Sequence, residues 1–109
     1  MRIWDIPAEK LCRSHLLGEH RELHALWSIL TQNKRGYAHH PETLRWKGKL
    51  AALYHRHEVL VNEMLRRGYQ HKSPLDQCLA TGEQHQTVVL DPVEKQYQIL
   101  ASKKCSCKR

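Results

Sequence analysis

The stretch SHLLGEHRELHALWSILT, residues 14–31, decides the fold because its pattern predicts one long amphipathic helix. At about 100° per residue, its leucines and Trp27 fall on one arc, which is the face that such a helix buries. Ser14 is a candidate N-cap at its start, and the loop-forming segment from Asn33 to Gly36 comes after its end. This helix predicts an all-α protein in which other helices cover the apolar face.

Three ionisable residues lie along one edge of that apolar face. By helical geometry, His15, Glu19 and Glu22 fall within roughly 60° of one another. Carboxylates are rarely buried without a partner or a purpose. Two interpretations are open: either Glu19 and Glu22 form ion pairs with Arg21, Arg2 or histidines, or this edge is half of a reactive site.

Two short turns accompany the long helix. Asp5 is a candidate N-cap for a turn that extends to Glu9 and should hold the N-terminal residues against the next part of the chain. A second helical turn is expected after His39-His40, because Pro41 is well suited to the first position of a helix.

An amphipathic pattern from about Lys49 to Arg67 predicts a second long helix, which Gly68 ends. We interpret His57, in the middle of its apolar face, as a packed core histidine. That face is predicted to comprise Leu50, Leu53, Tyr54, Leu60, Val61, Met64 and Leu65.

The last third of the chain predicts a loop and then one more helix. Residues 70–90 lack periodicity, whereas Asp91-Pro92-Val93-Glu94 is typical of a helix start, with Asp91 as N-cap. This helix should run to about Ala101 and bury Val93, Tyr97 and Leu100. We therefore expect a compact single domain of about three main helices over residues 1–102, and a free basic tail over residues 103–109 that contains cysteines.

Length and charge narrow the class of protein. A chain of 109 residues is long enough for one hydrophobic core and too short for two. Its 18 Lys and Arg against 11 Asp and Glu give a net charge of +7, which favours a polyanion such as nucleic acid as partner, or else a merely basic soluble protein. The sequence has no long apolar run and no cleavable leader, so we expect a cytoplasmic, nucleoid-associated protein without a membrane partner.

The four cysteines give a weak signal. They are expected to be reduced thiols, they form no CxxC pair, and a zinc site gathered from all four remains an alternative. They are Cys12, Cys78, Cys105 and Cys107. We expect no cofactor.

The α-amine of Met1 is a candidate nucleophile. Its ordinary pKa lies near about 7.7–8, so roughly a tenth is neutral at pH 7, and adjacent Arg2 favours that form. The large Arg2 side chain should also prevent removal of the initiator methionine. A neutral amine attacks an electrophilic carbon and forms a Schiff base. A nearby carboxylate, Glu22 or Glu19, could stabilise the cationic transition state and transfer protons, with His15 orienting it.

Several motifs resemble the pyrimidine dimer DNA glycosylase family. The start of the chain resembles the phage member, endonuclease V, in Arg2-Ile3, His15, Glu19 and Arg21-Glu22-Leu23. Residues 63–69 are also similar to that enzyme. Closer similarity is to the bacterial and archaeal branch, through Met1 to Asp5, Arg35-Gly36-Tyr37, His39-His40-Pro41 and Arg67-Gly68-Tyr69. The resemblance covers about residues 1–75.

The resemblance implies an all-α DNA glycosylase with abasic-site lyase activity that needs no metal. Met1 would supply the amine that attacks C1′ of the 5′ nucleotide of a cyclobutane dimer, and Glu22 would be the essential carboxylate. Arg2, Arg21 and His15 would bind or orient the lesion and its phosphates, and Glu19 would support the site.

Binding to double-stranded DNA without sequence preference fits the composition, and we expect a monomer. Basic side chains that could track the phosphate backbone are Lys34, Arg35, Arg45, Lys47, Lys49, Arg66 and Arg67. Aromatic candidates for wedging or stacking against distorted bases are Trp4, Tyr37 and Trp46, whereas Trp27 and Tyr54 are expected in the core.

The residues are also compatible with two other functions. One is a helical metal-binding protein that uses His15, Glu19 and His39 or His40, because a spacing of four residues places two ligands on one helix face. The nearby Arg2 disfavours a cation there. The other is a basic DNA-binding module without catalytic activity.

Overall fold

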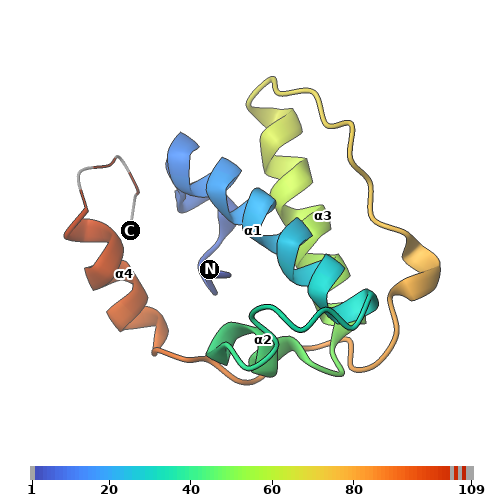
Figure 1. Cartoon of the computed structure of the whole chain (residues 1–109). Coiled ribbons are helices and arrows are strands. Elements are labelled where there is room, and N and C mark those ends of the chain that lie inside the picture. The colour runs from blue at the N-terminus through green and yellow to red at the C-terminus, as the bar shows by residue number, and fades with distance from the viewer. Residues whose placement is uncertain (1, 104, 106, 108–109) are drawn as a thin grey trace.

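The computed structural model describes residues 2–103, 105 and 107, and this part of the chain is helical without any strand (Figure 1). The all-α fold predicted from the sequence is therefore confirmed. The elements are η1 (Ala8–Lys10), α1 (Arg13–Thr31), α2 (Pro41–Trp46), α3 (Leu50–Arg66), η2 (Gln77–Leu79) and α4 (Val93–Ala101). Among the described helices, none is long and apolar enough to cross a membrane.

The core lies where α1 packs against α3. Leu16, Leu23 and Leu26 of α1 and Leu53 and Leu60 of α3 are fully shielded from solvent. Burying each such side chain contributes about 1.5–3 kcal/mol, so this pair of helices dominates the stability of the fold. In Figure 1, α2 lies at one end of the pair, and α4 lies apart on the other side of the N-terminal segment.

Several predicted helix boundaries are confirmed. His40 is the N-cap of α2, where its ring accepts a hydrogen bond from the Glu42 N–H, and Pro41 occupies the first helical position. Gly68 comes just after α3 with a φ of +91°, the left-handed conformation that glycine adopts at low cost after a helix.

The predicted N-caps of three other elements are wrong. The residue before α1 is Cys12, and Ser14 lies exposed inside the helix. The turn η1 begins after Pro7, and α4 begins after Pro92. The carboxylates of Asp5 and Asp91 are engaged in tertiary contacts instead, so neither is available to cap a helix.

The apolar faces of α3 and α4 are narrower than their sequence patterns predict. Leu65 is 53% exposed and Val93 is 39% exposed, so the prediction that both lie in the core is wrong. In α4 it is Gln96 that is buried beside Leu100, because the amide of Gln96 bonds to the N-terminal segment.

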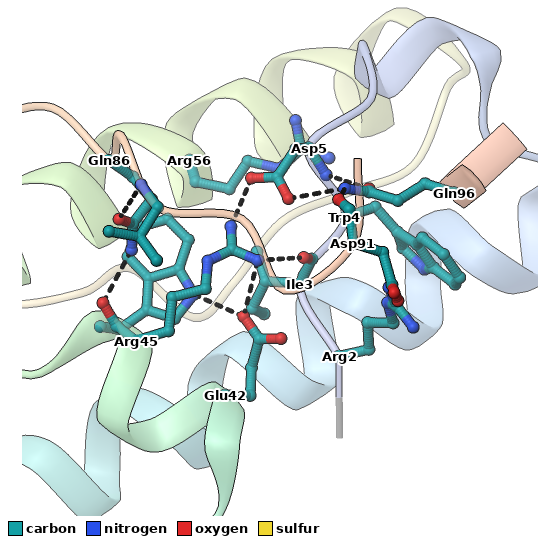
Figure 2. A network of polar contacts seen from close by, with 12 residues as sticks. Arg2, Ile3, Trp4, Asp5, Glu42, Arg45, Arg56, Gln86, Asp91 and Gln96 are labelled. Carbon is teal, nitrogen blue, oxygen red and sulfur yellow. Dashed lines mark hydrogen bonds and ion pairs between the residues drawn. The ribbon is translucent and has the colours of Figure 1, made fainter. Parts of the chain in front are cut away.

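The N-terminal segment is held by residues that are distant in sequence (Figure 2). The Asp5 N–H donates to Gln96 Oε1 at 2.8 Å, and Gln96 Nε2 donates back to Asp5 Oδ2 at 2.9 Å. Buried Arg45 of α2 forms ion pairs with Asp5 and Glu42 and donates to the Ile3 carbonyl. Because α2 and α4 both hold residues 3–5, this segment has a defined position in the fold.

The loop between α3 and α4 runs around the outside of α3 and then past α2 (Figure 1). It also completes the N-terminus of α3, where the N–H groups of Ala51 and Ala52 donate to the carbonyls of Thr81 and Glu83 at 2.8 and 3.0 Å. These donors have no partner inside the helix, so the loop satisfies them.

The described part of the C-terminal tail does not extend freely, contrary to the expectation from the sequence. Cys107 packs against the core, and its Sγ accepts a hydrogen bond from the Cys12 N–H at 3.1 Å. The tail thereby returns to the start of α1.

Candidate active site

A polar hollow of about 240 Å³ lies between the N-terminal segment and α1. The residues that line it are Arg2, Trp4, Ser14, His15, Gly18, Glu19, Glu22 and Lys103. The sequence predicts that His15, Glu19 and Glu22 share one edge of the helix, and the structure confirms it. Lys103 is not predictable in this position, because only the return of the tail brings it here.

Glu19 is a structural residue at the floor of the hollow. Its Oε2 accepts a hydrogen bond from Arg56 Nε at 2.6 Å, and its Oε1 accepts from Arg56 Nη2 at 3.1 Å and from the Trp4 N–H at 3.2 Å. Burial raises the pKa of this carboxyl, and the guanidinium of Arg56 opposes that rise. With both oxygens occupied, Glu19 positions the N-terminal segment and α3 rather than reacting.

Glu22 differs from Glu19 although it lies one turn further along α1. It is partly exposed, and within the described part of the chain its carboxylate has no hydrogen bond or ion pair. The alternative that both glutamates pair with Arg21, Arg2 or histidines is therefore wrong for the described residues: Glu19 pairs with Arg56, and Glu22 is left available to a ligand.

Arg2 also lines the hollow, and Figure 2 shows its side chain beside Asp91. Its guanidinium is paired with Asp91 and stacks over the Trp4 ring, 4.6 Å from the ring centroid. Hydrogen bonds from Arg2 and Lys95 hold the pKa of the Asp91 carboxyl below its usual value. No local sequence signal could reveal this pairing, because 89 residues separate Arg2 from Asp91.

Two predicted site residues are not placed in the hollow. Met1, the candidate nucleophile, lies outside the described residues. Arg21 is exposed on α1 and does not line the hollow.

Two further hollows extend the site along α1. Glu22 also lines a hollow of about 210 Å³ with Ala25, Ile29 and Tyr37. Ile29 continues into a third hollow, of about 520 Å³, whose lining residues are Ile29, Leu30, Asn33, Lys34, Arg35, Ala38, His39, Thr43, Lys47, Gly48 and Leu50. Because neighbouring hollows share a residue, a surface path connects the carboxylate to a basic region.

Tyr37 stands out on this path. Its side chain is 71% exposed, and its backbone has a φ of +60°, which costs energy for a residue with a Cβ atom. An exposed aromatic ring in a strained backbone position, between a carboxylate and basic residues, is a candidate for stacking against a ligand.

Four of the side chains predicted to contact DNA are engaged within the fold instead. Arg45 is buried in its ion pairs, and Arg67 donates to the Leu11 carbonyl at 2.6 Å. Trp46 is buried and donates from Nε1 to Glu42, whereas Trp4 is buried beneath Arg2. The other predicted basic residues are exposed or partly exposed: Lys34, Arg35, Lys47, Lys49 and Arg66. Among them, Arg66 pairs with Glu63, and Lys49 donates to Gln86. As predicted, Trp27 is in the core and Tyr54 packs against it.

The predicted metal-binding sets do not form, but other donors gather. His15 Nδ1 lies 3.1 Å from Cys12 Sγ and 3.3 Å from Cys107 Sγ, with Cys105 close by, whereas Cys78 is exposed elsewhere. Burial alone would raise the pKa of Cys12, but hydrogen bonds involving His15 and Cys107 lower it to about 6. This group could hold a thiophilic metal. A second group consists of histidines from α1, α3 and the segment after α3.

The fold and the hollow define a small helical protein with a carboxylate, unpaired within the described residues, beside its N-terminal segment and a basic surface next to it. The model of the pyrimidine dimer DNA glycosylase family matches residues 1–77, and the chain belongs to this family. Comparison with curated proteins and with solved structures gave no match. The family resemblance predicted from the sequence is confirmed. Membership of this family implies that the substrate is DNA that carries pyrimidine dimers.

Proposed function

We propose that this chain is a DNA glycosylase with abasic-site lyase activity, and that Met1 and Glu22 carry out the reaction. The observation that supports the proposal is the Glu22 carboxylate, which has no partner among residues 2–103, 105 and 107 and lies in the same hollow as Arg2. Met1 directly precedes Arg2, so its Cα is one peptide unit, about 3.8 Å, from that of Arg2. Within residues 3–5, Trp4 is held by Glu19 of α1 and Asp5 by Gln96 of α4.

The proposed reaction begins when the neutral Met1 amine attacks C1′ of the 5′ nucleotide of the dimer. The glycosidic C1′–N bond breaks, and its electron pair leaves with the pyrimidine. The amine loses a proton and the sugar ring opens to an imine. Loss of a C2′ proton then expels the 3′ phosphate by β-elimination. No step requires a metal or a redox cofactor.

Glu22 is proposed to stabilise the positive charge that develops at C1′ and then to move protons during elimination. Arg2 and His15 line the same hollow and would bind or orient the lesion, and Arg21 would contact a phosphate outside it. Glu19 acts indirectly, by holding the Trp4 backbone.

Duplex DNA is proposed to lie along the three connected hollows. Lys34, Arg35 and Lys47 are exposed around the largest hollow and would neutralise phosphates, while Tyr37 would stack against a displaced base near Glu22. A lesion is easier to open than an intact pair, which favours its selection.

Borohydride trapping tests the proposal directly. The chain with its native N-terminus is incubated with duplex DNA that contains either a thymine dimer or an abasic site, and the imine is reduced. We expect a covalent adduct whose peptide maps to Met1, and its loss after N-terminal acetylation or extension by one residue.

The outcomes separate the alternatives. An adduct that survives acetylation, or that maps to a lysine, overturns the N-terminal mechanism. An adduct with abasic DNA alone would support the lyase step and would overturn the proposal that the chain cleaves dimers. Binding without any adduct or strand cleavage would make the chain a DNA-binding module without this chemistry.

A further inference from the structure

Four histidines meet on the side of the α1–α3 pair away from the hollow. His20 and His24 are four residues apart on α1, His57 comes from α3, and His71 lies shortly after the end of α3. Their candidate ligand nitrogens all lie within 4.8 Å of one another. On a helix, His20 and His24 each lie about 160° around the axis from Glu22, so this cluster is separate from the proposed active site.

The orientation of His57 directs its free lone pair into the cluster. Its Nδ1 lies 3.1 Å from the Glu58 carboxylate, which can only accept, so we place the proton on Nδ1. His57 Nε2 then presents a lone pair, and it lies 3.1 Å from His24 Nε2. The Nε2 of His20 is buried without a hydrogen-bond partner among the described residues. His24 and His57 satisfy each other if His24 carries its proton on Nε2, but the buried His20 Nε2 beside them has no such partner among the described residues, which points to a ligand at this place.

The imidazoles have the protonation state that a metal requires. Burial, together with the neighbouring histidines, lowers the pKa of His20 to about 4. Burial likewise lowers the pKa of His24 and of His57. At neutral pH these three rings are uncharged, as metal-ligating histidines are.

The spacing suits a tetrahedral ion. With Zn–N bonds of about 2.0–2.1 Å, two nitrogens of a tetrahedron are about 3.4 Å apart, close to the 3.1 Å between His24 and His57. The candidate nitrogens of the whole cluster lie within 4.8 Å of one another, so His20 and His71 have to move inward to reach that spacing. The contact between His57 and Glu58 matches the carboxylate–histidine arrangement that orients zinc ligands in proteins.

We propose that His20, His24, His57 and His71 form a structural zinc site. Four protein ligands fill the tetrahedral coordination of Zn²⁺ and leave no position for a substrate, as is typical of structural rather than catalytic zinc. The ion connects α1, α3 and the segment after α3, and so fixes the rotation of α1 that places Glu19 and Glu22. This proposal is independent of the Met1 chemistry, which needs no metal.

Titration of the metal-free full chain with Co²⁺ alone tests the site, because tetrahedral Co²⁺ absorbs visibly. We expect one ion bound through nitrogen in the Cys12→Ser variant, in which the separate cysteine group has lost one of its three thiols; thiolate charge-transfer absorption would mark any ion that this group still holds. His20→Gln and His71→Gln, both at half-buried positions, should each weaken binding on the order of 100-fold. His55→Gln, at an exposed position on α3, is the matched control and should bind normally.

A stability measurement gives a second readout that does not depend on activity. In the Cys12→Ser background, Zn²⁺ at 100 times its Kd should raise the melting temperature of the parent and of its His55→Gln variant, and should leave its His71→Gln variant nearly unchanged. Two results overturn the proposal: absence of visible Co²⁺ absorption in Cys12→Ser, or equal Co²⁺ affinity in His55→Gln, His20→Gln and His71→Gln. Either result would leave the cluster as a metal-free stack of neutral rings.

Discussion

The Trp4 N–H donates a hydrogen bond to Glu19 Oε1 at 3.2 Å, and this contact separates the roles of two carboxylates on one helix. Glu19 joins the N-terminal segment to α1 and, through Arg56, to α3. Glu22, in the same hollow, is left without a partner among the described residues. One glutamate is thus expected to govern stability and the other activity.

Replacing Glu19 by glutamine should destabilise the fold. The substitution removes the charge that Arg56 requires, and the Arg56 side chain is only 14% exposed, so we expect a loss of about 2–4 kcal/mol in the free energy of unfolding. Urea denaturation monitored by circular dichroism measures it. A variant as stable as the native chain would show that the Glu19 contacts contribute nothing.

Replacing Glu22 by glutamine should have the opposite pattern. The side chain has no partner to lose among the described residues, so the free energy of unfolding should change by less than about 0.5 kcal/mol. Cleavage of dimer-containing DNA should fall about 10²–10⁴-fold, the usual effect of removing an acid–base group. Glu9→Gln, at an exposed position outside the hollow, serves as the control for both assays. Unchanged cleavage by Glu22→Gln would remove this residue from the mechanism.

Lys34 and Arg35 should determine the salt dependence of DNA binding. If each neutralises one phosphate, the double variant Lys34→Ala/Arg35→Ala should reduce the slope of log affinity against log salt by about 2. Fluorescence anisotropy with duplex DNA at several salt concentrations gives this slope. Lys72→Ala removes an exposed positive charge next to the histidine cluster, and we expect it to leave the slope unchanged. Equal slopes in all three proteins would place the DNA elsewhere.

Gly82→Ala should destabilise the loop that completes the start of α3. Gly82 has a φ of +82°, and a Cβ there would lie 2.2 Å from the Gly48 carbonyl oxygen. The backbone would have to move, which would break the bonds from Ala51 and Ala52 to the neighbouring loop carbonyls. We expect a loss of about 1–3 kcal/mol by thermal unfolding. Gly36→Ala, where a Cβ meets nothing within 4 Å, is the control and should be nearly neutral.

Helical periodicity predicted α1 and α3 well because each buries one continuous apolar face. Pro41 correctly marked the start of α2 and Gly68 the end of α3, since proline and glycine act through local backbone geometry. The caps at Asp5 and Asp91 failed because these carboxylates bind partners tens of residues away. Local propensity cannot anticipate such competition.

In the candidate site, too, local helix geometry was predictable from the sequence and the tertiary contacts were not. The edge formed by His15, Glu19 and Glu22 arises from helix spacing alone, but which carboxylate remains unpaired depends on Arg56 in another helix. His57 was correctly predicted to be buried, yet its interpretation as a simple core residue missed its neighbours. Those neighbours come from α1 and from the segment after α3, so only the tertiary structure brings them together.

Glu63 should make stability depend on pH in the acidic range. Hydrogen bonds from Arg66 and Arg67 lower the pKa of its carboxyl to about 2, below the value of about 4.3 for an unfolded glutamate. The folded state therefore favours the charged form, so the contribution to stability is complete above about pH 4.3 and is lost as the pH falls towards 2. Because Arg66 is largely exposed, we expect Glu63→Gln to cost only about 1 kcal/mol at pH 7. Urea midpoints should differ from the native chain at pH 7 and converge near pH 2, whereas Glu83→Gln should behave as the native chain throughout. A difference that persists at pH 2 would mean that Glu63 acts through packing rather than charge.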